Sequence, residues 1–336
     1  MRKTIVFTGQ EKLEIREDAI PQPGSGELLV QTTCTLISSG TEMIVFTRNF
    51  SPGTSWSGWV KYPFLPGYLH TGRVSALGEG VEGWQVGDRV ASRSNHSSHV
   101  LVPVSKAVRI PDAVSDEDAT WMGLGQITQI GARAAAPQIG DSVVVIGLGL
   151  LGQLIVQYAR MMGARDVIAI DTSPLRLAMA DSHGATQVLA MPAEVAIDAL
   201  RDLTHGHGAD TVYDVTGHPA AFAASLQLAR RFGTVILMGD TGTPEQQHLT
   251  GDVLNRGVRI VGAHDTHPPE VPHELARWSK REMQELFLTF LARGQMQVNN
   301  LITHRFPFAK AERAYALLGH ERDKAMGVMV TWELDG

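Results

Sequence analysis

The pattern of apolar and polar positions changes once along the chain, and the change separates two kinds of architecture. The first hundred residues contain short β-like runs at 4–7, 27–33, 72–76, 88–91 and 100–104. Turns rich in glycine and proline lie between these runs. Short strands divided by such turns predict an antiparallel or barrel-like, β-rich domain.

After Pro111 the pattern becomes one of buried strands that alternate with helical segments. Ser115 and the three acids that follow it predict a helix start, because serine caps a helix and carboxylates complement its positive end. Near-continuous apolar strands with helices between them predict a parallel sheet that is covered on both faces. We therefore expect an α/β fold with a doubly wound Rossmann sheet. The strands expected in this sheet are 142–146, 166–170, 211–215, 234–238 and 259–261.

The tail of the chain predicts a return to the first domain. Amphipathic helices are expected near 279–292 and 310–318, and the apolar run 327–332 looks like a last strand. A chain of 336 residues is comfortable for two domains. We expect a β-rich catalytic domain from residues 1–114 and 263–336, and a dinucleotide-binding domain from residues 115–262.

Composition and charge exclude several classes of partner. The formal net charge is -6 without a long run of one sign, which disfavours a nucleic-acid groove. No stretch of about twenty apolar residues occurs, so no membrane span is expected. The only cysteine is Cys34, which rules out an intrachain disulfide and suits a reducing compartment. Because the first residues read as a strand rather than a signal segment, we expect a cytoplasmic protein.

Residues 147–152 carry the pattern of a dinucleotide-binding loop between a predicted strand and a predicted helix. Gly147 would permit a tight turn, Gly149 would let backbone approach a pyrophosphate, and Gly152 would allow helix and strand to pack closely. The helix N-terminus, with Leu150 and Leu151, would supply N–H groups to the phosphates. A bare GxGxxG is weak evidence, so its position after a strand matters.

Asp171 strengthens this interpretation and favours NAD over NADP. It ends the next predicted strand, 19 residues after Gly152, where a carboxylate can accept hydrogen bonds from the adenosine ribose. A 2′-phosphate there would bring like charges within ~4 Å, at a cost of about 4 kcal/mol per charge pair at an effective dielectric of 20. Arg176 lies five residues further on and would soften this repulsion.

The order of a β-rich front, a Rossmann middle and a returning tail resembles the medium-chain dehydrogenase/reductase superfamily, nearly end to end. The matching segments are 87–90, with the sequence GDRV, then 143–152, 171–177 and 184–186. The resemblance implies a GroES-like catalytic domain and identifies Thr128 as a cofactor-contacting threonine. We complete the cofactor set with Thr216, Met238 and His264. His264 follows the last Rossmann-type strand, although a hinge loop is the alternative there.

The chain departs from the zinc-binding members of that superfamily at each expected ligand. Ser39 stands where they carry a cysteine, Tyr68 where they carry a histidine, and Leu124 four residues before Thr128, where a third ligand is expected. These side chains cannot rebuild a tetrahedral zinc site. A second metal site at His96 and His99 lacks further ligands, and a polar loop is the alternative. No metal is expected.

Without zinc, organic side chains would have to activate the substrate oxygen. Thr41 matches the superfamily's proton-relay hydroxyl, and Glu42 matches the acid that supports its metal site, so Glu42 becomes a candidate base or a support for Tyr68. The phenol of Tyr68 is expected in the reacting cleft, and His70 titrates near neutral pH. Each has a structural alternative: a turn cap for Thr41, a pair with an arginine such as Arg93 for Glu42, a wall residue for Tyr68 and a hydrogen-bonded structural histidine for His70.

The segments 38–42 and 62–68 look like the branch that contains bacteriochlorophyllide dehydrogenases and sugar-associated oxidoreductases. That resemblance implies NAD-dependent oxidation of a secondary alcohol on a polyol, sugar or ring-bearing substrate. An aromatic loop suits such a ring, unless its side chains only pack the loop. The loop contains Trp56, Trp59, Tyr62 and Phe64.

Two other functions stay open at this point. Reduction of a quinone or activated alkene is known for zinc-free relatives, but those enzymes commonly use NADPH, and Asp171 counts against it. A non-catalytic dinucleotide-binding protein would bind NAD without turnover. The expected partner is a small alcohol or ketone, and the edge strand 259–261 would pair two subunits in a homodimer, as the resemblance suggests.

Overall fold

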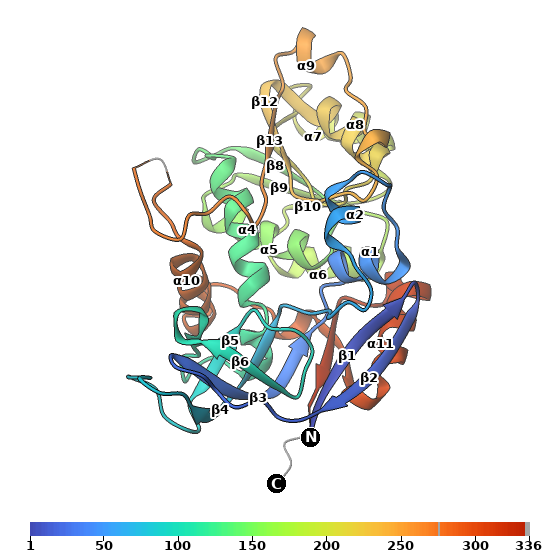
Figure 1. Ribbon diagram of the computed structural model, residues 1–336. Coiled ribbons are helices and arrows are strands. Elements are labelled where there is room, and N and C mark those ends of the chain that lie inside the picture. Colours follow the sequence, from blue (N-terminus) through green and yellow to red (C-terminus); the bar gives the residue numbers. More distant parts are fainter. Residues whose placement is uncertain (275, 333–336) are drawn as a thin grey trace. The chain divides into compact units, whose positions relative to one another are not determined.

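The computed structural model describes residues 1–274 and 276–332. The chain packs as two compact units (Figure 1). The first contains Met1–Leu124 and the segment from Ser279 onward, and the second contains Gly125–Trp278. Both limits lie later in the chain than the domain limits expected from the sequence. Among the helices of the described residues, none is long and apolar enough to cross a membrane.

The second unit is built on a six-stranded parallel sheet. Its strand order is β10-β9-β8-β11-β12-β13, which in chain order is the 3-2-1-4-5-6 arrangement of the Rossmann fold. The order reverses between β8 and β11, so the carboxyl ends of these strands form the switch point at which such sheets bind ligands. The strands are β8 (Ser142–Ile146), β9 (Asp166–Asp171), β10 (Gln187–Ala190), β11 (Ala209–Asp214), β12 (Ala229–Leu237) and β13 (Arg259–Gly262).

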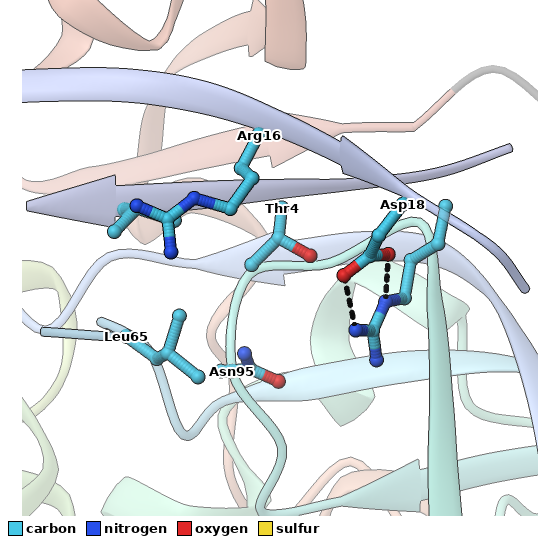
Figure 2. A pocket seen from close by; sticks show the side chains of 7 residues that line it. Thr4, Arg16, Asp18, Leu65 and Asn95 are labelled. Atoms are coloured by element: carbon cyan, nitrogen blue, oxygen red, sulfur yellow. Dashed lines mark hydrogen bonds and ion pairs between the residues drawn. The ribbon is translucent and has the colours of Figure 1, made fainter. Parts of the chain in front are cut away.

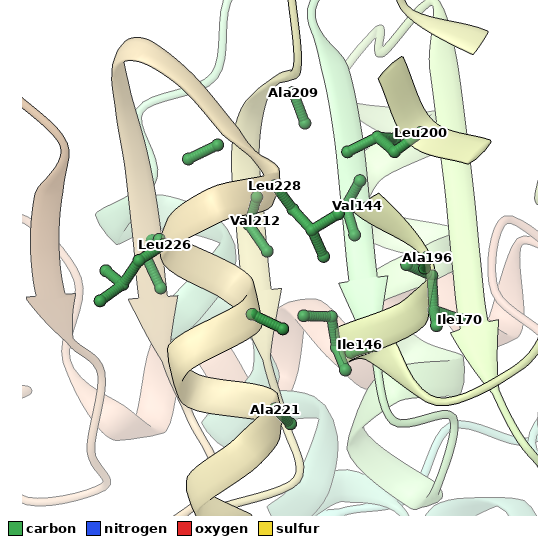
Figure 3. Close-up of a cluster of buried hydrophobic side chains, with 14 of the residues drawn as sticks. Val144, Ile146, Ile170, Ala196, Leu200, Ala209, Val212, Ala221, Leu226 and Leu228 are labelled. Carbon is green, nitrogen blue, oxygen red and sulfur yellow. The ribbon is translucent and has the colours of Figure 1, made fainter. Parts of the chain in front are cut away.

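The apolar runs of the sequence fill the interior of this unit. Val144, Val212 and Leu228 lie in a buried cluster between the sheet and helix α8 (Figure 3). Burial of each such side chain stabilises the fold by about 1.5–3 kcal/mol. The helices of this part of the chain are α4 (Met122–Ala134), α5 (Leu150–Met161), α6 (Pro174–Ser182), α7 (Ile197–Leu203), α8 (Pro219–Leu228) and α9 (Asp252–Asn255).

The first unit is β-rich, as the sequence pattern predicts. A hairpin of β1 (Arg2–Gly9) and β2 (Lys12–Asp18) accompanies a seven-stranded sheet with the order β14-β15-β3-β4-β5-β7, in which β6 also pairs with β3. The last strand, β15, pairs antiparallel with β3, so the tail returns to this unit as expected. The strands are β3 (Glu27–Leu36), β4 (His70–Leu77), β5 (Arg89–Ser92), β6 (His99–Pro103), β7 (Val108–Arg109), β14 (Ile302–Pro307) and β15 (Gly327–Thr331).

Helices complete the first unit. Ser279 and Glu282 form a capping box that begins α10 (Lys280–Ala292), and the side chain of Ser115 accepts a hydrogen bond at the start of α3 (Asp116–Ala119). Helix α11 (Ala311–His320) places Tyr315 in the core. Its ring makes a T-shaped contact with Phe7, with the ring centroids 5.0 Å apart. The helices α1 (Thr41–Thr47) and α2 (Ser55–Trp59) are too short to show an apolar periodicity, so the sequence pattern did not predict them.

Candidate functional site

The loop after β8 has the backbone of a phosphate cradle. Gly147 adopts a positive φ of 87°, and Gly149 is the N-cap residue of α5. A Cβ atom on Gly152 would lie 2.0 Å from the carbonyl oxygen of Gly147, so only glycine fits there. A Cβ atom on Gly149 would meet nothing within 4 Å. The 12-residue helix α5 therefore begins with its N–H groups, including those near Leu150 and Leu151, beside open space, as a dinucleotide site requires.

Asp171 lies at the carboxyl end of β9 and is joined to this loop. Its carboxylate accepts hydrogen bonds from the backbone N–H of Leu148 at 2.7 Å and of Ser173 at 2.8 Å. Arg176 is 4.0 Å from the carboxylate. A carboxylate has about four acceptor positions, so two hydrogen bonds leave capacity for ribose hydroxyl groups.

The other predicted cofactor residues belong to the same unit but differ in exposure. Thr216 follows β11 and faces the loop, because a Cβ atom on Gly147 would lie 2.6 Å from its methyl group. Thr128 on α4 and Met238 after β12 are buried. His264 is exposed, and its Nδ1 atom lies 2.9 Å from the hydroxyl of Thr266. The geometry thus brings Thr216 to the glycine loop most directly.

In the first unit, Tyr68 lies in a cluster with Ser38, Thr41 and Arg93, which we call the tyrosine cluster. The phenol oxygen of Tyr68 is 2.6 Å from the hydroxyl of Ser38. The side chain of Thr41 interacts with the phenol and favours its ionised form. The Arg93 guanidinium lies over the ring, 4.8 Å from its centroid. Burial raises the pKa of the phenol, and the two hydroxyl groups and Arg93 act in the opposite direction. Tyr68 and Thr41 therefore lie in one cluster.

Glu42 is buried behind the tyrosine cluster and is satisfied by hydrogen bonds. One oxygen accepts from the backbone N–H of Ser38 at 2.7 Å. The other accepts from His96 Nε2 at 3.0 Å and from the Tyr315 hydroxyl at 2.6 Å. Neither predicted partner is used: Glu42 forms no ion pair with Arg93, and it reaches Tyr68 only through Ser38. This arrangement suits a supporting role rather than that of a base.

His70 is buried at the start of β4, and hydroxyl groups lie against both ring nitrogens. Thr32 lies 3.0 Å from Nε2, and Ser92 lies 2.8 Å from Nδ1. Burial, followed by the repulsion of His96, lowers the pKa of His70 to about 3. The imidazole is therefore neutral at physiological pH, and the geometry favours the structural alternative for His70.

The positions that hold zinc in the superfamily's metal-dependent members have no metal-binding set in this structure. Ser39 and Leu124 are buried. His96 is buried too, with Glu42 and Thr35 as partners, while the half-buried His99 is bonded to Ser98. Within residues 1–274 and 276–332, no group of three or more His, Cys, Asp and Glu side chains could hold a metal ion.

The aromatic loop divides into packing residues and one exposed ring. Trp56 is buried, and the Tyr62 hydroxyl donates to the carbonyl of Val45 at 2.5 Å. The Phe64 ring stacks on Phe7. It also makes a T-shaped contact with Trp59, with the ring centroids 5.1 Å apart. Trp59 is 55% exposed, so it alone offers an aromatic face to a ligand.

A shallow pocket of about 240 Å³ lies beside the β1–β2 hairpin, lined in part by Leu65 and Asn95 (Figure 2). Its Arg2 side chain forms a two-bond ion pair with Asp18, at 2.7 and 2.6 Å. Arg16 is likewise paired with Glu14, at 2.7 Å. Since both cations are neutralised, this pocket has no excess charge with which to select a ligand.

Sequence reasoning did not connect Ser38 or Arg93 with Tyr68, or Tyr315 with Glu42. Ser38 lies inside the matched segment 38–42 but was given no role, and Tyr315 is far away in the chain and carried no local signal. Arg93 follows β5 and Tyr68 precedes β4, and they become neighbours only when these two strands pair.

Comparison with known proteins agrees with this architecture. Residues 24–112 match the alcohol dehydrogenase GroES-like domain, and residues 151–281 match the zinc-binding dehydrogenase family. An uncharacterized zinc-type alcohol dehydrogenase-like protein of Escherichia coli is 25% identical, over 92% of this chain and 93% of its own length. The L-threonine 3-dehydrogenase of Symbiobacterium thermophilum is 27% identical, over 91% of each chain.

A solved structure shows the same fold. Galactitol-1-phosphate dehydrogenase from Escherichia coli superposes with a TM-score of 0.80 over 98% of this chain and 99% of its own, at 20% identity. The two matched family segments follow one another along the chain and together cover well over half of it. In this chain the β-rich unit comes first, the Rossmann sheet follows it, and the tail returns to the β-rich unit. The chain belongs to the medium-chain dehydrogenase/reductase superfamily of oxidoreductases.

Proposed function

We propose that the protein is a zinc-independent, NAD-dependent dehydrogenase that oxidises a secondary alcohol to a ketone. The observation that carries this proposal is the tyrosine cluster: a phenol, hydrogen-bonded at 2.6 Å to Ser38, stands where zinc-dependent relatives place a metal ligand. A hydroxyl network of this kind can bind a substrate oxygen and exchange a proton with it.

The chemistry assigns one task to each group. NAD, held by the second unit, would supply the acceptor for the hydride that leaves the carbinol carbon. Tyr68 in its phenolate form takes the proton of the alcohol O–H, and Ser38 holds the phenol oxygen by a hydrogen bond. In the reverse direction the protonated phenol donates a hydrogen bond to the ketone and then its proton. Because burial raises the pKa of Tyr68, the protonated form dominates near neutral pH.

The donor set supports chemistry without zinc. A catalytic zinc site needs three protein ligands from Cys, His, Asp or Glu. Ser39, Tyr68 and Leu124 do not supply such ligands, and Glu42 is engaged by three hydrogen bonds. The residues present therefore do not fit a zinc ion, and we route no step through one.

The second unit fits NAD. The loop 147–152 and the α5 N-terminus would hold the pyrophosphate, with Thr216 beside Gly147. Asp171 would accept the adenosine ribose hydroxyl groups and repel a 2′-phosphate. Arg176, at 4.0 Å, reduces this repulsion without removing it.

The substrate class we propose is a polyol, sugar or ring-bearing secondary alcohol. Two relatives are named as dehydrogenases of hydroxyl-bearing molecules, L-threonine and galactitol 1-phosphate. The exposed face of Trp59 suits the apolar face of a sugar or another ring. We also propose a cytoplasmic homodimer paired through β13, which lies at the edge of its sheet.

The test is a screen for NAD reduction across polyols, sugars and aryl carbinols, with metal analysis of the same sample. For the best substrate, Tyr68→Phe should lower kcat/KM by about 10²- to 10⁴-fold, the usual contribution of a general acid or base. Tyr62→Phe is the matched control, because its hydroxyl only bonds the Val45 carbonyl. NAD binding without turnover, or equal rates for both variants, would favour a non-catalytic dinucleotide-binding protein. Stoichiometric zinc in active protein would contradict the proposal.

A further inference from the structure

Arg93 and Tyr68 are neighbours in the first unit. Tyr68 lies two residues before β4 and Arg93 one residue after β5, and these two strands pair at His70 and Ser92. The guanidinium carbon lies 4.8 Å from the centroid of the Tyr68 ring. A cation at this distance over an aromatic face is attracted to it and restricts the ring's rotation.

A hydroxyl group holds the oxygen end of the phenol. Ser38 lies 2.6 Å from the phenol oxygen, and the backbone N–H of Ser38 is fixed in turn by Glu42. Thr41 also favours the ionised phenol. The ring is therefore held between a cation on its face and the Ser38 hydroxyl at its oxygen.

Two charged groups act on Tyr68, and they have opposite signs. Arg93 favours the phenolate, whereas Glu42 and burial favour the neutral phenol. The Glu42 carboxylate is bonded by Ser38, His96 and Tyr315, so its negative charge is partly compensated by these donors. Arg93 is thus the positive charge that acts on the phenol within the tyrosine cluster.

We propose that Arg93 is a positioning residue, which holds the Tyr68 ring against Ser38 and stabilises the phenolate that accepts the substrate proton. This inference rests on the proposed function, in which the alcohol O–H bond breaks, a Tyr68 O–H bond forms and the hydride passes to NAD. Without the guanidinium, the phenolate becomes available only at higher pH. Arg93 itself exchanges no proton with the substrate.

The decisive measurement is an NMR titration that needs no substrate. The chain has five tyrosines, so protein labelled with ¹³C at the tyrosine ζ carbon gives few signals, and Tyr68→Phe identifies the one from Tyr68. Arg93→Met should move the Tyr68 titration midpoint upward by about half to one pH unit, because an opposite charge within 4–6 Å favours the ionised form. Arg93→Lys should keep most of the wild-type midpoint.

Arg16→Met is the matched control, since Arg16 is an exposed arginine of the same unit that pairs with Glu14. It should leave the Tyr68 signal unchanged. Should Arg93→Met fail to fold, Arg93→Gln makes the same test with a polar side chain. An unchanged or lowered midpoint after loss of the guanidinium would overturn the inference.

Kinetics give a second readout once a substrate is known. For alcohol oxidation, the rise of kcat/KM with pH should shift upward in Arg93→Met by the same interval as the NMR midpoint. A shifted midpoint in a protein without turnover would contradict the proposed function and leave the role of Arg93 intact. An unchanged Tyr68 midpoint in an Arg93→Met variant that still turns over substrate would contradict the role of Arg93 and leave the proposed function intact.

Discussion

At the scale of single residues, our proposal makes Asp171 the position that decides between the two coenzymes. We predict that Asp171→Asn lowers the preference for NAD over NADP at least about tenfold, because the amide loses the charge that repels a 2′-phosphate. Its oxygen can still accept the N–H of Leu148, so the loop is kept. Dissociation constants for both coenzymes measure the effect. An unchanged ratio would mean that Asp171 only supports the loop.

Glu42 tests whether a buried carboxylate acts in chemistry or in structure. In Glu42→Gln an amide N–H₂ group must face one of three donors, so we predict a loss of about 1–3 kcal/mol in the free energy of unfolding. The fall in kcat should be small beside that of Tyr68→Phe. Denaturant unfolding and steady-state rates measure the two effects, with the exposed Glu14→Gln as control. Full stability with abolished turnover would instead make Glu42 the base.

His70 predicts a specific dependence of stability on pH. Its pKa is about 3 in the folded protein and about 6.5 when unfolded, so between these values only the unfolded chain binds the proton. The contribution of His70 is complete above pH 6.5 and is lost as the pH falls toward 3. In His70→Gln the free energy of unfolding should therefore change with pH by about 1.4 kcal/mol less per unit between pH 4.5 and 6. Equal slopes in the two proteins would show that His70 titrates normally.

At the scale of elements, the glycines of the β8–α5 turn have different tasks: Gly152 is needed for folding, and Gly149 is proposed to be needed for NAD binding. A Cβ atom on Gly152 would lie 2.0 Å from the Gly147 carbonyl oxygen, whereas one on Gly149 meets no protein atom within 4 Å. We predict that Gly152→Ala lowers the melting temperature, while Gly149→Ala keeps it and weakens NAD binding at least about tenfold by filling the space meant for phosphate. Calorimetric melting and NAD titration distinguish the two. Unaltered NAD affinity in Gly149→Ala would contradict the proposed phosphate position.

Most elements could be read from the sequence because local pattern and burial agree in them. The strand 142–146 was predicted with the bounds that β8 has, and Ser115 was predicted as the serine that caps the helix after it. Strand β10 was not, since three of its four residues, Gln187, Val188 and Ala190, are exposed at the sheet edge and form no buried run. Helix α1, which carries Thr41 and Glu42, is too short to show a period.

At the scale of the whole molecule, residues 1–274 and 276–332 contain no cluster of three metal ligands, so we predict that neither unit depends on a metal. Chelation should leave both the melting temperature and the rate of NAD reduction unchanged, because bound zinc would otherwise contribute to the stability of the folded state. Melting curves and rates with and without a strong chelator make the measurement. A zinc-dependent alcohol dehydrogenase under the same treatment is the control. Loss of activity that added zinc restores would place a metal in this protein.

The sequence by itself determined the two architectures, the glycine loop and the acid that follows it, because these depend on periodicity and on residue types at short spacing. Only the tertiary structure decided how the catalytic candidates divide. In the folded structure Glu42 and His70 lie in buried hydrogen-bond networks, and Arg93 lies over the ring of Tyr68. The physical reason is that a polar side chain's role depends on its partners, and folding brings those partners from distant parts of the chain.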